Sequence, residues 1–475
     1  MTGDSPPEPF PARRRPDAGI VAAVIDALRA RFGPRLSTGH ALREQHASTL
    51  TWVPNQPPDA VVFPQDTDEV RSVVKLCAEH GVPIIPFGTG SSLEGHVNAP
   101  HGGISVDLSS MNRILAVHPE DLDVVVQAGV TRKMLNEHLR DQGLFFPIDP
   151  GADASLGGMA ATRASGTNAV RYGTMRDAVL ALTVVLPNGD VVRTAPRARK
   201  SSAGYDLTRL LVGSEGTLGI ITELTLRLSG IPEAIAAGLC PFPSIEAACE
   251  ATILTIQAGL PIARIELLDE VQVRACNAYS RLALPETPLL LVEFHGSDAS
   301  VREQSERFGE IADAHGGGPF RWATEAEERT RLWQARHDAY WAAMSLRPGA
   351  KAISTDVCVP ISRLAECVQA AKRDILESGL VAPIVGHVGD GNFHCLLLVD
   401  PDLPEEVARA TGFIDRLVRH ALALEGTCSG EHGIGQKKMR FMAEEHAPAT
   451  LALMRSLKRA IDPRGIMNPG KLLDL

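Results

Sequence analysis

The sequence predicts an α+β protein with two domains, the second of which carries an antiparallel sheet. A strand-helix-strand pattern between residues 60 and 87 is followed by a strand pair at 178–194 around the turn Pro187-Asn-Gly-Asp190. Beyond Pro232 the pattern changes to helices separated by fewer strands. At 475 residues the chain is long enough for this division.

Capping and turn residues set the elements expected in the first half. A helix over 17–31 is expected to end at Gly33-Pro34, and a second helix is expected between the cap Asp66 and the stop Gly81. Strands are expected at 60–64, 82–87, 104–108, 122–128, 178–186, 191–194 and 218–228, and a helix over 131–141.

The second half predicts fewer strands. Helices are expected over 244–259 and 362–378, strands at 289–294 and 356–360, and a hairpin at 387–394. One helix followed by a chain of turns is expected in 451–475. We expect four segments: a tail with the first helix (1–53), a cofactor domain (54–232), a substrate domain (233–425) and a C-terminal segment that returns to the site (426–475).

Composition excludes several classes of protein. The net charge of −10 without a basic stripe argues against nucleic-acid binding. The eight cysteines are scattered without a CxxC pair, which favours reduced thiols. No run approaches 18 apolar residues, so no transmembrane helix is expected. We therefore expect a cytoplasmic protein, with peripheral attachment to the inner membrane left open, and we interpret residues 1–16 as a flexible tail without a secretion signal.

The run His387-Val-Gly-Asp-Gly-Asn-Phe-His394 predicts a metal site. Asp390-Gly391 is typical of a two-residue type I′ turn, which would place His387 opposite His394. Two histidines and a carboxylate such as Glu431 would give three ligands and an open position, as in a catalytic metal centre. The other interpretation is two unrelated histidines in a glycine-rich loop.

Four clusters of glycines and hydroxylated residues lie in the first domain. They are Pro86–Gly95, Asp149–Gly158, the pairs Ser165-Gly166 and Tyr172-Gly173, and Gly213–Thr222. The first is neither a Rossmann nor a Walker A motif, and alone it would be interpreted as a turn. Together the clusters let backbone approach a large flat ligand closely.

These clusters resemble the PCMH-type FAD-binding domain of the vanillyl-alcohol oxidase superfamily. Downstream, 347–360, the 387–394 hairpin, 429–435 and 468–471 resemble the branch of metal-containing 2-hydroxy-acid dehydrogenases that includes FAD-dependent D-lactate dehydrogenase, D-2-hydroxyglutarate dehydrogenase and the glycolate oxidase D subunit. The resemblance covers residues 54–475 and implies a two-subdomain FAD-binding domain followed by an α+β substrate domain. The Arg347–Pro360 segment is most similar to D-lactate dehydrogenase.

The resemblance implies non-covalent FAD and one divalent metal, zinc or manganese, on His387, His394 and Glu431. His432 is the candidate general base, Arg347 and the weaker candidate Lys351 are clamps for the substrate carboxylate, and Asn392 is a supporting residue. The candidate FAD contacts are Pro86, Gly88, Thr89, Gly90, Ser91, Ser92, Gly95, Pro150, Gly151, Ser155, Gly158, Met159, Thr162, Ser165, Gly166, Tyr172, Glu215, Gly219, Ile220, Ile221 and Asn468.

The implied reaction is oxidation of a D-2-hydroxy acid, best matched by D-lactate, to the 2-oxo acid. A cytochrome, quinone or electron-transfer protein would be the acceptor, and a homodimer is compatible with the family. Thr162 departs from the asparagine of many members, and the surroundings of His96 do not match relatives that attach FAD covalently. D-2-hydroxyglutarate or glycolate oxidation, a metal-dependent hydrolase and a non-catalytic flavin-binding subunit are the alternatives.

Overall fold

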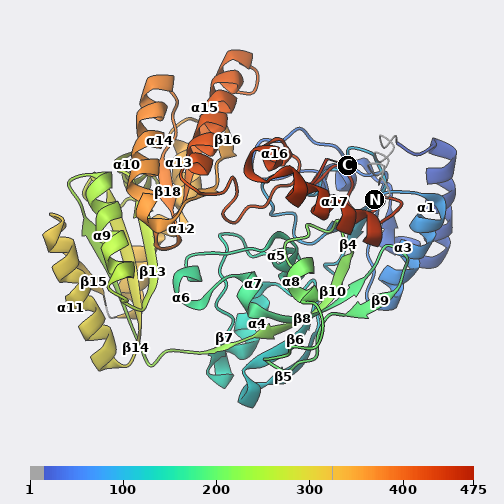
Figure 1. Cartoon of the computed structure of the whole chain (residues 1–475), viewed down its shortest axis with the longest axis horizontal. Helices are drawn as coiled ribbons and strands as arrows, with labels where there is room; N and C mark the ends of the chain where they lie inside the picture. Colours follow the sequence, from blue (N-terminus) through green and yellow to red (C-terminus); the bar gives the residue numbers. More distant parts are fainter. Residues whose placement is uncertain (1–14, 324, 475) are drawn as a thin grey trace, which may run out of the picture.

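The computed structural model describes residues 15–323 and 325–474 and has the predicted α+β architecture. Residues 1–14 of the expected flexible tail lie outside the described residues. Figure 1 shows two lobes, the first built from the N-terminal half and the second from the middle of the chain. Each has a hydrophobic core, one from residues 21–228 with Ile466 and Met467 and one from residues 236–473.

A small mixed sheet begins the first lobe. Its order is β1-β2-β4-β3, in which β2 and β3 both run parallel to β4. The strands are β1 (Leu36–Ser37), β2 (Ala60–Val62), β3 (Ile84–Phe87) and β4 (Ile104–Asp107), and the helices are α1 (Ala18–Phe32), α2 (His40–Gln45) and α3 (Thr67–His80). Asp66 caps α3 by accepting from the Glu69 N–H at 2.8 Å, and Gly81 ends it with φ +66°, as predicted.

A five-stranded antiparallel sheet, ordered β5-β6-β10-β8-β9, completes the first lobe. Its strands are β5 (Ile114–His118), β6 (Asp123–Gln127), β8 (Val179–Val185), β9 (Val191–Arg193) and β10 (Ile220–Arg227). The predicted hairpin is confirmed, with Val185 opposite Val191. Short elements join these strands: α4 (Arg132–Leu139), β7 (Leu144–Phe145), α5 (Leu156–Thr162), α6 (Ala169–Tyr172), α7 (Met175–Ala178), α8 (Leu207–Leu211) and β11 (Ser229–Gly230).

The second lobe is an eight-stranded sheet covered by helices on both faces. Its strands are β12 (Ala234–Pro241), β13 (Ile262–Leu268), β14 (Leu289–Gly296), β15 (Arg321–Ala323), β16 (Lys351–Ser354), β17 (Val357–Cys358), β18 (Ile384–Gly386) and β19 (Asn392–Val399). One face packs on α9 (Ile245–Gln257), α11 (Asp298–Ala314), α14 (Leu364–Ser378) and α15 (Pro404–Ala423). The other face packs on α10 (Glu270–Ser280), α12 (Ala326–His337) and α13 (Ala339–Ser345).

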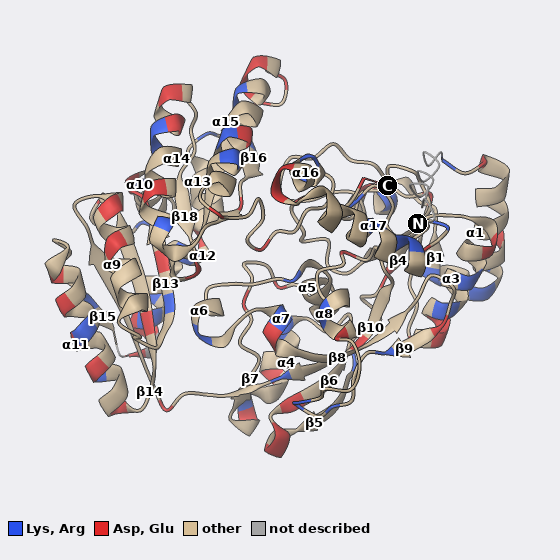
Figure 2. Ribbon diagram, in the orientation of Figure 1, with Lys and Arg blue, Asp and Glu red and all other residues tan. Residues whose placement is uncertain are grey.

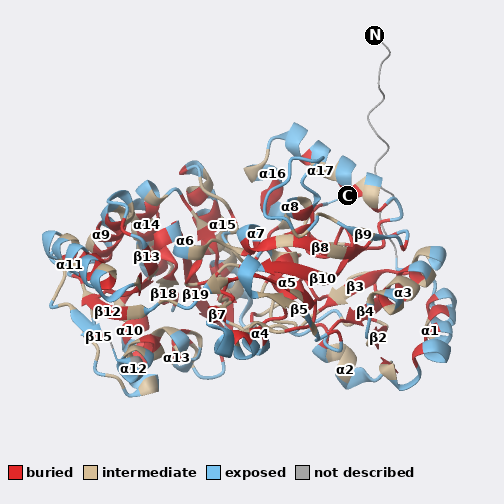
Figure 3. Cartoon of the chain, turned by 90° about the horizontal axis from the view of Figure 1, so that it is seen from below, coloured by how far each residue is buried: buried red, intermediate tan, exposed pale blue. Residues whose placement is uncertain are grey.

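Burial and charge follow this layering. The strands are largely buried and the outer helices carry the exposed positions (Figure 3). Acidic and basic side chains are interspersed on these helices (Figure 2). Within the described residues, no helix combines the length and the apolar character that crossing a membrane would need.

The predicted register of the 387–394 hairpin is wrong. His394 pairs with Val385 and Cys395 with Ile384, so His387 lies beyond the end of β18. The connection contains the 3₁₀ turn η5 (Val388–Asp390), and only Gly391 takes a positive φ, +77°. A type I′ turn needs positive φ at both central positions, which Asp390 does not adopt. The longer loop still brings the two rings to 5.5 Å between centroids.

The C-terminal segment returns to the first lobe, with α16 (Met442–Glu445) and α17 (Pro448–Ile461) (Figure 1). Met467 forms a β-bridge with Ile84, and the Lys458 ammonium donates to the Thr217 carbonyl at 2.6 Å. The buried Glu215 carboxylate accepts from the N–H groups of Ile434 and Gly435 at 2.7 and 2.8 Å. Residues 430–435 are thereby held against the first lobe.

Candidate functional site

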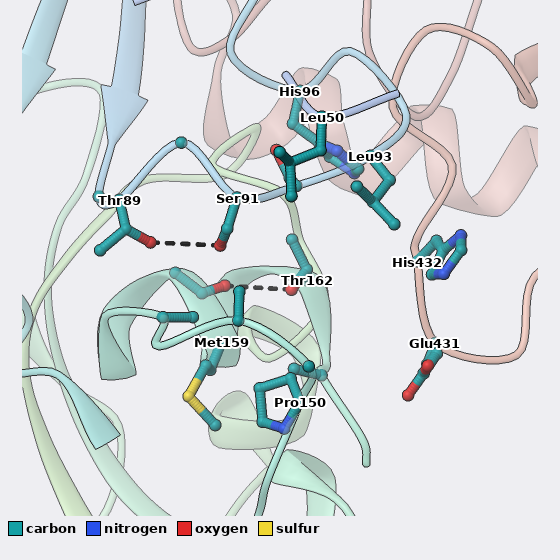
Figure 4. Close-up of a pocket in the computed structure, with 18 of the residues that line it drawn as sticks. Leu50, Thr89, Ser91, Leu93, His96, Pro150, Met159, Thr162, Glu431 and His432 are labelled. Atoms are coloured by element: carbon teal, nitrogen blue, oxygen red, sulfur yellow. Dashed lines mark hydrogen bonds between the residues drawn. The ribbon is translucent and has the colours of Figure 1, made fainter. Parts of the chain in front are cut away.

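A cavity of about 410 Å³ lies between the two lobes and the C-terminal segment. Figure 4 shows Thr89 and Ser91 of the glycine-rich loop on one side of it and Glu431 and His432 on the other. Pro150, Met159 and Thr162 line the cavity between them. The cavity therefore joins the predicted cofactor loops to the predicted metal site.

The cofactor side is shaped for close approach to a polar ligand. A Cβ at Gly88 would lie 2.1 Å from the Ser155 hydroxyl oxygen, so only glycine fits this contact. The Ser92 and Ser155 hydroxyls are buried without a hydrogen-bond partner among the described residues. Buried hydroxyls are normally paired, and the oxygens of a bound pyrophosphate would satisfy both. The loops thus fit FAD.

Most of the candidate FAD contacts line this cavity. They are Pro86, Gly88, Thr89, Gly90, Ser91, Ser92, Pro150, Gly151, Ser155, Gly158, Met159, Thr162, Ser165, Glu215, Gly219, Ile221 and Asn468. The substituted position Thr162 donates its hydroxyl to the Gly158 carbonyl at 3.2 Å (Figure 4).

The other four lie outside the cavity lining. Gly95 and Gly166 pack against Gln436 and Asp149, respectively. Ile220 is buried on the opposite face of its strand from Ile221. The Tyr172 hydroxyl reaches across to the second lobe, 2.7 Å from His295 Nδ1.

The predicted metal ligands converge on one point. Glu431 Oε1 lies 3.1 Å from His387 Nε2 and 3.3 Å from His394 Nε2. One ligand atom from each residue lies within 4.8 Å of the other two. Two imidazoles and a carboxylate are the donors that zinc and manganese take in proteins.

The other nitrogen of each ring is held by a buried acceptor. His387 Nδ1 donates to Glu266 Oε1 at 2.7 Å, and His394 Nδ1 donates to the Thr355 carbonyl at 3.0 Å. Both rings therefore present Nε2 to Glu431. This support of metal-binding histidines by carboxylates and carbonyls is general.

Neighbouring charges oppose the effect of burial on the pKa values of this group. Burial alone would lower the pKa of His387, but the Glu266 and Glu431 carboxylates raise it well above its usual value. Burial acts oppositely on Glu431, whose pKa is nevertheless held well below the usual value by His387 and His394. A cation at this point would take the place of the imidazole proton.

Asp356, His394 and His432 form a second set of close ligand atoms. The Asp356 carboxylate, however, already accepts from the backbone N–H groups of Glu431 and His432, with its closest contact to His432 at 2.9 Å. It also accepts from Lys438 at 3.2 Å and from Asn392 Nδ2 at 2.8 Å. Asp356 is thus a support for the 430–433 turn, and Asn392 supports Asp356.

Glu431 and His432 both reach the cavity although they are adjacent. Gly433 takes φ +82°, and a Cβ at Gly430 would lie 2.2 Å from Asn392 Nδ2, so the turn needs both glycines. The His432 ring stacks on His394 with centroids 5.0 Å apart, and its Nδ1 lies 3.3 Å from Glu94 Oε1. Burial alone would lower the pKa of His432, but Asp356 and Glu94 raise it.

The structure does not bring Arg347 or Lys351 to the cavity. Arg347 forms a two-pronged ion pair with Glu406, with Nη2 at 3.0 Å from Oε2, and Lys351 is exposed on β16. The structure therefore does not support the expected carboxylate clamp at either residue. The cavity contains Arg336 instead, whose Nε donates to Glu266 Oε2 at 2.7 Å. No described residue hydrogen-bonds to its two terminal nitrogens.

Sequence reasoning missed residues whose roles depend on long-range packing. Glu94, Glu266, Asp356 and Arg336 have no local motif that marks them. The aromatic residues before Arg347 could have pointed to this part of the cavity wall. Tyr340 and the 54% exposed Trp341 line the cavity, while Trp333 is buried in the core.

Comparisons with known proteins agree with this geometry. Residues 58–195 match the family described as FAD binding domain, and residues 231–472 match FAD linked oxidases, C-terminal domain. The chain belongs to the FAD-linked oxidases and is an FAD-dependent oxidoreductase.

Two curated relatives and one solved structure place it more narrowly. The chain is 53% identical to "Probable D-lactate dehydrogenase, mitochondrial" of Danio rerio, over 96% of this chain and 92% of the relative. It is 49% identical to "D-lactate dehydrogenase [cytochrome], mitochondrial" of Arabidopsis thaliana, over 88% and 73% of the two chains. The structure of p-cresol methylhydroxylase shares the fold, with TM-score 0.79 at 20% identity over 96% and 97% of the two chains. Within the FAD-linked oxidases, the chain belongs to the family of the D-lactate dehydrogenases.

These findings correct two expectations. The expected cytoplasmic location is contradicted, since the Danio rerio and Arabidopsis thaliana relatives are named as mitochondrial. The alternative of a metal-dependent hydrolase is not supported, because the C-terminal half matches the FAD linked oxidases and the two relatives are named as dehydrogenases.

Proposed function

We propose that this protein oxidises D-lactate to pyruvate with FAD and one divalent metal ion, and passes the electrons to a cytochrome. The observation that carries the proposal is the convergence of His387, His394, Glu431 and His432 in the cavity that the cofactor loops line. The names of the two relatives supply the substrate and the class of acceptor.

The bound flavin supplies a two-electron acceptor for the hydride that leaves C2 of the substrate. His387, His394 and Glu431 would hold a divalent ion, which would supply a Lewis acid to lower the pKa of the substrate hydroxyl. Zinc and manganese both suit this donor set. Glu266 and the Thr355 carbonyl hold the two imidazoles with Nε2 toward the ion position.

His432 is the proposed general base, and it removes the hydroxyl proton as the C2 hydride leaves. Its Nδ1 lies beside Glu94, so Nε2 is the nitrogen available to a substrate. The proton passes to the imidazole, and the electron pair of the broken C2–H bond leaves with the hydride. The hydroxyl carbon becomes the carbonyl carbon of the 2-oxo acid.

Arg336 is the proposed partner of the substrate carboxylate. Its Nε is anchored on Glu266 at 2.7 Å, which leaves the two terminal nitrogens for a two-pronged contact. Nearby Tyr340 and Trp341 line the same cavity and would contact the substrate side chain. D-2-Hydroxyglutarate and glycolate are the alternative substrates of the same chemistry.

A panel of D- and L-2-hydroxy acids with an artificial electron acceptor tests the proposal. Metal-loaded holoenzyme should give its highest kcat/KM with D-lactate and at least about 10-fold less with L-lactate, because reversed configuration moves the C2 hydrogen off the hydride path. A higher kcat/KM with D-2-hydroxyglutarate or glycolate would support the proposed reaction but reject D-lactate as the preferred substrate. Turnover by the isolated chain would also exclude a non-catalytic flavin-binding subunit.

A further inference from the structure

Glu94 belongs to the glycine-rich loop of the first lobe, but its side chain contacts the C-terminal segment. Its Oε1 lies 3.3 Å from His432 Nδ1 and 3.5 Å from the Lys438 ammonium. The residue is 2% exposed. Its backbone carbonyl also accepts from the Gln436 N–H at 2.8 Å. The loop and the segment are thus fastened together at Glu94.

We propose that Glu94 is a positioning residue for His432 that determines which ring nitrogen faces the substrate. This inference rests on the proposed role of His432 as the general base. A buried carboxylate beside Nδ1 favours the tautomer with the proton on Nδ1, which leaves Nε2 as the basic nitrogen. Glu94 is not among the residues that line the cavity, so its route to the reacting atoms is its contact with the imidazole.

The other contacts of His432 do not determine which ring nitrogen faces the substrate. Stacking on His394, with an angle of 7° between the rings, fixes the plane of the imidazole. The backbone N–H of His432 is fixed by Asp356 at 2.9 Å. Neither contact distinguishes the ring from the same ring given a half turn about the Cβ–Cγ bond, which exchanges Nδ1 with Cδ2. The hydrogen bond to Glu94 does.

Glu94 lies in the same glycine-rich loop as residues that fit the cofactor. Ser92, two residues earlier, has a buried hydroxyl without a partner among the described residues, where the cofactor loops fit FAD. The loop that holds the cofactor therefore also orients the base. This arrangement ties the orientation of His432 to the loop whose hydroxyls fit the pyrophosphate of the cofactor.

The local charges allow a conservative variant to fold. Lys438 contacts Asp356 at 3.2 Å as well as Glu94, so it keeps a carboxylate partner in Glu94→Gln. Glutamine retains the size of the side chain and an oxygen acceptor but loses the charge that selects the tautomer. Glu94→Asp keeps the charge on a shorter arm and is the second variant.

The test is anaerobic rapid mixing of holoenzyme with D-lactate, followed by flavin absorbance, in the wild type and five variants. Glu94→Gln should keep full FAD and metal content and an unchanged substrate concentration for half-saturation. Its flavin reduction should slow by at least about 10-fold, and by no more than the roughly 10²–10⁴-fold typical of complete loss of an acid–base group. Glu94→Asp should be faster than Glu94→Gln. Exposed Glu79 of the same lobe gives the control Glu79→Gln, which should match the wild type.

A double variant decides whether Glu94 acts through His432. In the His432→Ala background, Glu94→Gln should cause no further slowing, because the group it positions is gone. Multiplied effects, or loss of FAD or metal in Glu94→Gln, would overturn the positioning role. Wild-type reduction in Glu94→Gln while His432→Ala is slow would overturn it and leave the proposed function intact. Wild-type reduction in His432→Ala would reject the base and this inference together.

Discussion

Glu266 and His387 form a buried carboxylate–imidazole pair, with Oε1 accepting from Nδ1 at 2.7 Å. The second oxygen of the same carboxylate accepts from Arg336 Nε at 2.7 Å. One fully buried side chain of β13 thereby supports both a proposed metal ligand and the proposed substrate clamp. The proposed metal site and the proposed substrate clamp share this support.

Glu266→Gln should weaken metal binding while FAD remains bound. Loss of the charge behind His387 removes the orienting partner of the imidazole, and such supporting partners typically contribute about 10–100-fold in metal affinity. Competition with a chelator of known affinity measures the change. Exposed Glu250 of the same lobe provides the control Glu250→Gln. Unchanged metal affinity in Glu266→Gln would contradict the role of this pair.

Arg336→Met should raise the KM for D-lactate by about 10–100-fold, which corresponds to roughly 1.5–3 kcal/mol for hydrogen bonds to a charged group. Arg347→Met is the matched variant, because Arg347 pairs with Glu406 outside the cavity lining. It should keep the KM of the wild type. Steady-state kinetics of the two variants separates them, and the reverse result would return the clamp to Arg347.

Metal binding should release protons and should weaken as the pH falls. In the metal-free protein Glu266 and Glu431 raise the pKa of His387, so the imidazole stays protonated above pH 6.5 and a cation must displace that proton. The stabilisation from this protonated ring is fully present below the unfolded pKa and is lost as the pH rises through the raised one. The Tm gained on metal loading should therefore grow as the pH rises towards the raised pKa of His387 and level off above it. Calorimetric titration in buffers of different ionisation enthalpy measures the released protons, and none released would refute the account.

Glu431→Gln and His432→Ala should fail differently. Glu431→Gln removes the negative ligand between the two imidazoles, so metal content should fall and excess metal should restore part of the activity. His432→Ala should keep metal and FAD and slow flavin reduction by about 10²–10⁴-fold. Metal analysis together with rapid mixing distinguishes the two. Metal loss in His432→Ala with retention in Glu431→Gln would exchange the assignments.

FAD should be released when the protein is denatured. The cavity contains His96, but its Nε2 lies 3.2 Å from the buried Glu215 carboxylate, and the sequence around it does not match relatives with covalent FAD. Acid precipitation followed by absorbance of the supernatant measures free flavin. Flavin that remains with the precipitated chain would implicate His96.

Local patterns in the sequence predicted the features that depend on short segments. The caps Asp66 and Gly81, the hairpin turn at Gly189 and the glycine clusters each act within a few residues. The convergence of His387, His394 and Glu431 was predictable because histidine is scarce, with 15 in 475 residues. The register of the 387–394 loop was not, because Asp390-Gly391 suits a type I′ turn that the longer η5 connection replaces.

Residues that act across the cavity could not be predicted from spacing. Arg336 lies on α12 and reaches Glu266 on β13, 70 positions away. Glu94 and His432 are 338 positions apart. From the sequence alone, Arg336 and Arg347 are equally plausible partners of a substrate carboxylate. Only the folded structure shows that Arg336 lines the cavity and Arg347 does not. Long-range placement, rather than residue type, selects between them.

The most direct test of the central claim is anaerobic reduction of the enzyme-bound flavin by D-lactate, with and without the metal. Metal-loaded holoenzyme should bleach in one rapid phase and yield one pyruvate per flavin. Chelated enzyme should keep its FAD yet reduce at least about 100-fold more slowly, since a Lewis acid contributes several kcal/mol to such a step. Equal rates in the two preparations, or no bleaching by D-lactate in either, would contradict the account.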